Sequence, residues 1–239
     1  MSASVNQSVE MTDAVLVADL RQVRLAEERS RLWLQTYAVL KRLIDVLGGF
    51  MGTLLLVPIV VIVKLAMLMT GDFGSMFYLQ ERVGKDGKIF KLVKFRSMCL
   101  DAEERLQKLL AEDKAAAREY AKMHKLKNDP RITKVGKFLR RSSLDELPQC
   151  INILLGQMSL VGPRPFLPRE LEKHYVRPEI YRGIKPGLTS YWAVNGRSDV
   201  SYRKRLELEY YYVDNFSPLL DLKILAKTFG AVVKGSGAK

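Results

Sequence analysis

The amino-acid sequence predicts a mostly helical α+β fold with one β-hairpin and one proline-interrupted apolar helix. Three observations predict it. A run of 18 uncharged, largely apolar residues extends from Val46 to Val63 and contains Pro58. The turn sequence Gly84-Lys-Asp-Gly87 separates two segments suited to strands. Several later segments carry leucines at helical spacing.

The sequence divides into three predicted parts. Residues 1–40 form a polar extension with a helix expected around Asp13–Gln35, rich in Leu, Val, Glu and Arg. Residues 41–70 contain the apolar helix, and residues 71–239 form the remaining domain. The polar, mixed-charge start of the chain is not a signal peptide.

The apolar run allows two membrane arrangements. At about 1.5 Å per residue it covers roughly 27 Å, barely a bilayer core. Basic residues flank it on both sides, with Lys41 and Arg42 before it and Lys64 and Arg82 among those after it. Charge therefore gives no orientation for a helix that crosses once. A re-entrant helix, bent at Pro58 and leaving by the face it entered, explains both the proline and the flanks, and we favour it.

The elements after the apolar run follow from local patterns. Met76–Arg82 and Lys88–Arg96 are expected to pair as a hairpin, with Lys94 and Arg96 on one face because strand side chains alternate. Asp101–Met123 is predicted as one charged helix. Leu144–Leu155 is predicted as a helix that ends near Gly156, with an apolar stripe beginning at Leu144.

Ser217-Pro218 is a typical helix start, a capping serine followed by proline in the first turn. The helix that follows mixes apolar residues with lysines. It either packs on the core or lies in a membrane interface with its lysines directed outward.

Composition limits the classes of function. The 239-residue chain has a formal net charge of +13, and residues 64–239 carry all of it. This surface fits an anionic membrane leaflet, a polyphosphate ligand or nucleic acid. The two cysteines and the two histidines are widely separated, which argues against a disulfide framework, a zinc hydrolase and most Ser-His mechanisms.

Two adjacent acids, Asp145 and Glu146, follow five basic residues in the stretch 131–146. One interpretation is structural, because Ser143-Leu-Asp-Glu146 matches a capping box. Pro148 weakens that interpretation, since its missing N–H would break a bond inside the helix. The other interpretation is a site for an anionic, phosphate-rich substrate.

The second interpretation requires cations. A carboxylate is ionised near neutral pH, so it can attack phosphorus without a general base, provided that positive charge offsets the repulsion between two anions. Mg²⁺ needs only one or two protein carboxylates in addition to substrate phosphates. The candidate phosphate-binding residues are Lys94, Arg96, Arg140, Arg141, Arg164 and Arg197.

Arg164 is distinctive because Pro163 and Pro165 flank it and fix the direction of the turn. A second glycine-rich region, 185–189 and 195–197, either lines a pocket or merely turns the chain.

These residues, in this order, resemble the bacterial sugar transferase family, the monotopic phosphoglycosyl transferases that act on polyprenyl phosphate. The resemblance covers roughly Leu40 to Gly235. Its blocks, as they stand in this sequence, are the apolar helix with Pro58, Gln80-Glu-Arg-Val-Gly84, Lys94-Phe-Arg-Ser-Met98, Asp129-Pro-Arg-Ile-Thr133, Ser143-Leu-Asp-Glu-Leu-Pro-Gln149, Met158-Ser-Leu-Val-Gly-Pro-Arg-Pro165 and Lys185-Pro-Gly-Leu-Thr189.

The resemblance implies a reaction in which a UDP-sugar gives its sugar-1-phosphate to polyprenyl (undecaprenyl) phosphate and UMP is released. It implies Asp145 as the nucleophile that forms an aspartyl-phosphosugar intermediate, and Glu146 as the ligand of Mg²⁺. It places Lys94, Arg140 and Arg164 at the phosphate and nucleotide site, with Arg197 in a nearby loop. Family members commonly have glycine and glutamine where this chain has Ser190 and Ala193, which makes the assignment of Arg197 less direct.

The resemblance also implies a setting. It predicts a small cytoplasmic catalytic domain with amphipathic interfacial helices and a re-entrant membrane helix, at the cytoplasmic face of a bacterial inner membrane. The expected partners are the UDP-sugar, polyprenyl phosphate and membrane lipid, with a homo-oligomer possible, and the expected pathway is exopolysaccharide or glycoconjugate assembly. No residue pattern indicates which sugar is transferred.

Two alternatives accompany this prediction. In one, both substrates bind together and Asp145 acts as a base on the lipid phosphate. In the other, the chain is a non-catalytic, membrane-anchored basic protein that binds nucleic acid or anionic lipid. Few aromatic residues alternate with the basic stretches, so we expect no nucleic-acid partner.

Overall fold

The structure is a computed structural model that describes residues 2–123, 126–173, 178–181, 183–196 and 200–233. The chain divides into two units, Met1–Leu43 and Ile44–Lys239. The three-part division at residues 40 and 70 stays a prediction.

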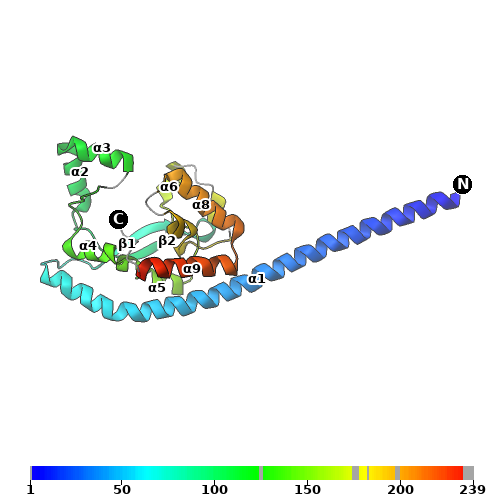
Figure 1. The fold of residues 1–239 in the computed structure, drawn as a ribbon, viewed down its shortest axis with the longest axis horizontal. Helices are drawn as coiled ribbons and strands as arrows, with labels where there is room; N and C mark the ends of the chain where they lie inside the picture. Colours follow the sequence, from blue (N-terminus) through cyan, green and yellow to red (C-terminus); the bar gives the residue numbers. More distant parts are fainter. Residues whose placement is uncertain (1, 124–125, 174–177, 182, 197–199, 234–239) are drawn as a thin grey trace. The chain divides into compact units, whose positions relative to one another are not determined.

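One helix, α1 (Ser2–Met69), spans the whole first unit and continues into the second. The separate helix expected over Asp13–Gln35 is a part of it. In the first unit the rings of Trp33 and Tyr37 stack with centroids 5.5 Å apart, as expected for aromatic residues four apart on a helix. In the second unit α1 continues through Pro58 and curves along its length rather than breaking there (Figure 1).

The predicted fold class is confirmed as mostly helical α+β with a small hairpin and one long apolar N-terminal helix. The strands are β1 (Phe77–Val83), β2 (Ile89–Phe95), β3 (Ser159–Val161) and β4 (Gly187–Thr189). The α-helices after α1 are α2 (Ala102–Glu112), α3 (Lys114–Met123), α4 (Lys134–Arg141), α5 (Gln149–Leu154), α6 (Pro168–Lys173), α7 (Tyr191–Asn195), α8 (Tyr202–Asn215) and α9 (Pro218–Val233). The 3₁₀ turns are η1 (Lys85–Gly87), η2 (Leu144–Glu146) and η3 (Pro178–Tyr181).

The predicted hairpin is also confirmed. Strands β1 and β2 pair antiparallel, with Phe77 opposite Phe95 and Val83 opposite Ile89. The glycine-rich sequence forms the turn, and Gly87 has the positive φ of 78° that favours glycine. A second, parallel pair joins β3 to β4, so the segment 185–189 is partly strand and not only a loop.

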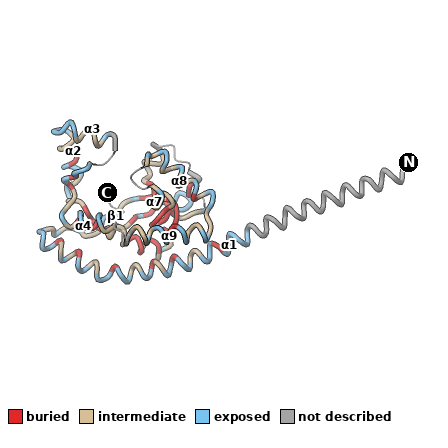
Figure 2. Tube along the Cα trace, viewed as in Figure 1, coloured by how far each residue is buried: buried red, intermediate tan, exposed pale blue. Residues whose placement is uncertain are grey.

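The apolar part of α1 has two different faces. One face packs on the hairpin and α4, where Leu56, Val63 and Met67 share a core with Phe95 and Leu139. The opposite face leaves large apolar side chains more than half exposed: Leu47, Phe50, Leu54, Val57, Val61 and Leu65. The alternation of buried and exposed positions is visible along this helix in Figure 2.

A buried carboxylate ties α1 to the second sheet. Asp45, only 3% exposed, accepts hydrogen bonds from Ser159 Oγ (2.9 Å) and Leu160 N (2.8 Å). Close contact also depends on glycine, because a Cβ added at Gly52 would lie 2.3 Å from Cys150 Sγ. The apolar helix is therefore an integral part of the second unit.

Two helix predictions need correction. The single helix expected over Asp101–Met123 is two helices, because Asp113 adopts an extended conformation and its Oδ1 accepts hydrogen bonds from Ala115 N and Ala116 N. Asp113 thus caps the start of α3 and ends α2.

The helix expected over Leu144–Leu155 is also wrong in its first half. Residues 144–146 form the 3₁₀ turn η2, and α5 begins only after Pro148, which lacks the N–H that a helix interior requires. The apolar spacing still holds, since Leu144, Leu147 and Ile151 pack against the core beneath α1.

The helix expected after Ser217-Pro218 is confirmed as α9, with Ser217 Oγ accepting a hydrogen bond from Leu220 N (3.3 Å). Its two sides differ. Ile224 is buried in a core with Val161 and Tyr212, whereas Leu222 and Phe229 are exposed. Packing on the core explains only one side of this helix.

Candidate active site

Four of the predicted site residues come from three elements that meet at one place. Lys94 is supplied by β2, Arg140 by α4, and Asp145 and Glu146 by η2. Lys94 Nζ lies 2.9 Å from Glu146 Oε1. Lys94 and Arg140 are both close enough to act electrostatically on Asp145.

The segment after β2 positions Arg140. Thr133 caps α4 by accepting a hydrogen bond from Gly136 N (2.9 Å), and Thr133 N donates to Ser97 O (3.1 Å). A Cβ at Gly136 would lie 1.9 Å from Ser97 O, so this close approach requires glycine. Ser97 Oγ then accepts a hydrogen bond from Arg140 Nε (2.9 Å), which fixes the guanidinium beside the acids.

The two acids follow a strained residue. Ser143 has φ +57°, in the left-handed region that non-glycine residues rarely adopt, and its side chain makes no capping hydrogen bond. The capping-box interpretation of Ser143 and Glu146 is therefore wrong. Strained conformations of this kind cost about 1–3 kcal/mol and gather at functional sites.

The environment of Asp145 is unfavourable for a charge. Burial, and then the neighbouring Glu146, raise the pKa of the Asp145 carboxyl from 3.8 to about 6, although Lys94 and Arg140 act in the opposite direction. A buried carboxylate that stays ionised near neutral pH is weakly solvated, which favours reaction with an electrophile.

The carboxylates at this site suit Mg²⁺ better than a metal ion whose ligands all come from protein side chains. Among the described residues, no group of three or more His, Cys, Asp or Glu side chains could hold a metal ion. Mg²⁺ commonly takes one or two carboxylates and completes its shell with substrate phosphates and water. Glu146 fits that role, because its side chain is 42% exposed and next to the more buried Asp145.

The predicted proline-flanked turn lies at the end of β3 and is held on several sides. Gly187 N donates to Pro163 O (2.9 Å), and Arg82 Nη1 donates to Pro165 O (2.8 Å). Arg164 N donates to Glu209 Oε2 (3.2 Å). The turn is therefore rigid, and Arg164 stands in a second cationic cluster with Arg205 and Trp192.

The other basic candidates, and Arg131 at the start of the same stretch, have different surroundings. Arg96 is paired with Asp72 (2.6 Å) and donates to Met98 O (3.0 Å), so it holds the loop between α1 and β1 rather than a phosphate. Arg131 forms a two-pronged pair with Asp129 (2.8 and 2.7 Å) that shapes the approach to α4. Arg141 is exposed at the end of α4. Arg197 lies outside the described residues.

Sequence reasoning did not identify Arg205 or Glu209 as candidates. Glu209 is fully buried in α8 and accepts hydrogen bonds from Arg164 N and Ser190 Oγ (3.1 Å). Arg205 lies one turn before it on the same helix. Their spacing of four was the available signal, but it is equally typical of exposed ion pairs.

Comparison with known proteins gives consistent matches. The family model for bacterial sugar transferases matches residues 36–235. The chain is 47% identical to the UDP-galactose-lipid carrier transferase of Erwinia amylovora over 83% of this chain and 41% of that protein. It is 42% identical to the undecaprenyl-phosphate galactose phosphotransferase of Salmonella typhimurium, over 91% of this chain and 45% of that protein.

A shorter relative is matched over most of its length. The exopolysaccharide production protein ExoY of Rhizobium meliloti is 42% identical, over 83% of this chain and 87% of that protein. The chain thus spans less than half the length of the first two relatives but corresponds to nearly all of ExoY.

Proposed function

Because this chain belongs to the bacterial sugar transferase family, we propose that it transfers a sugar-1-phosphate from a UDP-sugar to undecaprenyl phosphate and releases UMP. The observation that carries the proposal is the cluster of Asp145, Glu146, Lys94 and Arg140. The names of two relatives describe transfer to a lipid carrier or to undecaprenyl phosphate. The name ExoY supports a role in exopolysaccharide production.

In the proposed reaction an Asp145 oxygen attacks the phosphorus that bears the sugar. A P–O bond forms to the carboxylate, the anhydride P–O bond breaks, and UMP leaves with that electron pair. The phosphate oxygen of the lipid then attacks the same phosphorus and releases the Asp145 carboxylate. Lys94 and Arg140 lower the repulsion between the carboxylate and the diphosphate in the first step.

Glu146 would hold Mg²⁺, which supplies positive charge to the diphosphate when it is bound. In its absence Lys94 neutralises Glu146 directly. Lys94 therefore offsets negative charge at both acids, and this role depends only on residues of the chain.

We further propose that the chain acts at the cytoplasmic face of the inner membrane, with α1 residues 44–69 embedded from that face. One side of this helix packs on the catalytic body and the other exposes apolar side chains. A helix that crosses the bilayer alone would have lipid on all sides, so this arrangement favours entry without crossing. Exposed Leu222 and Phe229 of α9 would add a second apolar contact.

A UMP-release assay tests the proposal. The full chain, in detergent or nanodiscs, is given a panel of UDP-sugars with undecaprenyl phosphate and Mg²⁺. At least one sugar should give UMP and a lipid-linked sugar phosphate in equal amounts. No UMP from any sugar, with folded protein, would refute the proposed function.

The pH dependence of the reaction follows from Asp145. The value of kcat/KM for the UDP-sugar should rise between pH 5 and 7 with a midpoint near 6 when Mg²⁺ is limiting, because only the ionised carboxylate attacks. Replacing Lys94 with Met removes a cation that lowers this pKa, so the midpoint should move above 6. Lys137→Met removes an exposed lysine of α4 and should leave the midpoint in place. An unchanged midpoint in Lys94→Met would show that Asp145 does not govern the profile.

A further inference from the structure

Asp45 is the last charged residue before the apolar run of α1, and it is buried although burying a charged side chain is costly. One of its carboxylate oxygens, Oδ1, accepts both the hydrogen bond from Ser159 Oγ (2.9 Å) and the one from Leu160 N (2.8 Å). Ser159 is itself fully buried. The carboxylate therefore joins the start of the apolar helix to the first two residues of β3.

The face of α1 that carries Asp45 makes close contacts with two elements. Asp45, Gly48 and Gly52 lie on one side of the helix because they are three and four residues apart. A Cβ added at Gly48 would lie 2.5 Å from Leu160 Cδ1 in β3, and one at Gly52 would lie 2.3 Å from Cys150 Sγ in α5. Within the second unit, α4 and α5 lie along the inner side of the curve of α1 (Figure 1).

The later part of α1 supports the candidate catalytic cluster. The core formed with residues 56–67 of the helix includes Phe95, Leu139 and Leu144. Each of these three is next in sequence to a member of the cluster: Lys94, Arg140 and Asp145. One helix thus supports the reactive carboxylates through apolar contacts and β3 through the polar contact at Asp45.

The strand β3 connects the contact at Asp45 to the proline-flanked turn. Backbone hydrogen bonds of 2.9–3.1 Å join residues 159–163 to residues 186–189, and one of them runs from Gly187 N to Pro163 O. The two short strands and the start of the turn are therefore held together by hydrogen bonds. A shift of β3 at Ser159 would move the turn that presents Arg164.

We propose that Asp45 is a positioning residue for the transfer reaction, which sets where the proline-flanked turn lies relative to the Asp145 carboxylate. This inference rests on the proposed function and on Arg164 as a candidate phosphate-binding residue of the turn. Asp45 acts through β3 and not by contact with a substrate. A displacement of about 1 Å between a group that binds the substrate and the group that attacks it is enough to impair a reaction strongly.

The two supported parts of the site should respond differently when the bonds of Asp45 are lost. The turn should shift, whereas the cluster around Asp145 should stay in place because apolar contacts with residues 56–67 hold it. A binding group that is displaced weakens the binding of the UDP-sugar and raises its KM. A residue that only supports folding would instead lower kcat in proportion to the folded fraction and leave KM unchanged.

Hydrogen exchange of the full chain in nanodiscs tests the positioning contact without any substrate. Asp45→Ala removes the acceptor of the Leu160 amide, so residues 159–164 should exchange at least about tenfold faster. Residues 144–151 should change less than about twofold. Asp45→Asn keeps an oxygen that can accept both bonds and should restore slow exchange. The matched control is Asp214→Ala, the same replacement at an exposed aspartate of α8.

The UMP-release assay measures the effect of the same variants on the reaction. Asp45→Ala should raise the KM for the UDP-sugar about tenfold and leave kcat within about threefold. Asp45→Asn and Asp214→Ala should keep both values within about threefold of those of the unaltered chain. Slow exchange of residues 159–164 in Asp45→Ala, or fast exchange with an unchanged KM, would overturn the inference while UMP release continued.

Two further measurements keep the inference testable. If Asp45→Ala does not fold, Ser159→Ala removes one of the two donors and leaves Leu160 N bonded to Asp45; it should raise KM about threefold, and an unchanged KM would overturn the inference. If no UDP-sugar gives UMP, the affinity for UDP measured by calorimetry takes the place of KM. An affinity about tenfold weaker in Asp45→Ala would then keep the inference although the proposed function fails, and equal affinities would overturn both.

Discussion

Asp145→Asn should abolish the formation of a protein-bound phosphosugar and lower UMP release by about a thousandfold or more. The amide is nearly the same size as the carboxylate but cannot supply the oxygen nucleophile. Incubation with a UDP-sugar labelled in the phosphate next to the sugar, without lipid acceptor, should label the unaltered chain and not the variant. Unchanged turnover in Asp145→Asn would refute the covalent reaction and the base-catalysed alternative together.

The label also separates the two catalytic schemes. Direct transfer with Asp145 as a base predicts loss of turnover in Asp145→Asn but no labelled protein from the unaltered chain after rapid quenching. A pKa near 6 suits a base as well as a nucleophile, so pH dependence alone does not distinguish them. Label retained on the protein in the absence of lipid acceptor would favour Asp145 as the nucleophile.

Stability provides the control for folding. The folded pKa of Asp145, about 6, lies above the ordinary value of 3.8, so folding favours the protonated acid. The carboxyl therefore costs nothing below about pH 4, and its cost appears as the pH rises toward 6. The difference between the two values corresponds to up to about 3 kcal/mol.

Asp145→Asn should consequently unfold at a higher temperature than the unaltered chain at pH 7.5 without Mg²⁺, and at a similar temperature near pH 4. If Asp145→Asn is inactive but more stable, its activity is lost in the chemical step and not through unfolding. Such a trade between stability and activity is typical of catalytic sites. A variant that is both inactive and less stable at pH 7.5 would contradict the conclusion that the charged Asp145 carboxylate destabilises the folded chain.

The sequence indicated that Asp145 and Glu146 lie among cations, but it did not predict their local structure. The position of Asp145 and Glu146 among cations was visible because the charges are close in sequence. Their conformation was not visible, because Ser143 adopts a positive φ, and the Leu144 and Leu147 that follow pack on a core formed by residues remote in sequence. Local pattern favoured a capping box, and tertiary contacts overrode it.

Arg96 and Arg205 show that the local sequence does not determine the role of an arginine either. Arg96 lies two residues after Lys94, just beyond the end of β2, yet its partner Asp72 lies 24 residues earlier and decides its role. Arg205 occurs in a helix with many charges, where nothing local distinguishes it from the exposed Arg203. Arg96 differs from Lys94, and Arg205 from Arg203, in how far the side chain is buried. Burial depends on contacts remote in sequence.

The ion pair between Lys94 and Glu146 gives the two acids different environments. Glu146 is more exposed and already neutralised, whereas Asp145 is more buried and has a raised pKa. In the proposed reaction this difference would make Glu146 the ligand for cations and Asp145 the group that attacks. Their environments, rather than their chemistry, set this division.

Glu146→Gln should show that division in three measurements. UMP release should fall by about a hundredfold to a thousandfold, because the site loses the carboxylate that would hold Mg²⁺ at the diphosphate. The midpoint of the pH profile should move below 6, because Glu146 is a negative neighbour that raises the pKa of Asp145, and Lys94 is freed to act on Asp145 alone. The Mg²⁺ concentration for half-maximal rate should rise.

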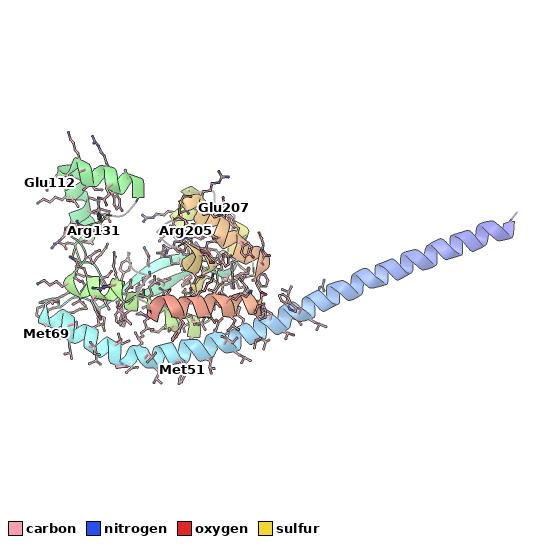
Figure 3. All side chains as sticks on the ribbon, viewed as in Figure 1. Met51, Met69, Glu112, Arg131, Arg205 and Glu207 are labelled. Carbon is pink, nitrogen blue, oxygen red and sulfur yellow. The ribbon has the colours of Figure 1, made fainter. Side chains whose placement is uncertain are left out.

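The matched control is Glu112→Gln, which neutralises an exposed acid at the end of α2 (Figure 3). Glu112 Oε1 lies 3.9 Å from Lys108 Nζ. It should leave the rate, the pH midpoint and the Mg²⁺ dependence within about twofold. A rate lost in Glu146→Gln with the pH midpoint and Mg²⁺ dependence unchanged would mean that Glu146 only supports the fold of η2. A slower enzyme that needs more Mg²⁺ and works at lower pH would instead tie the ligand and the nucleophile to neighbouring carboxyls of one turn.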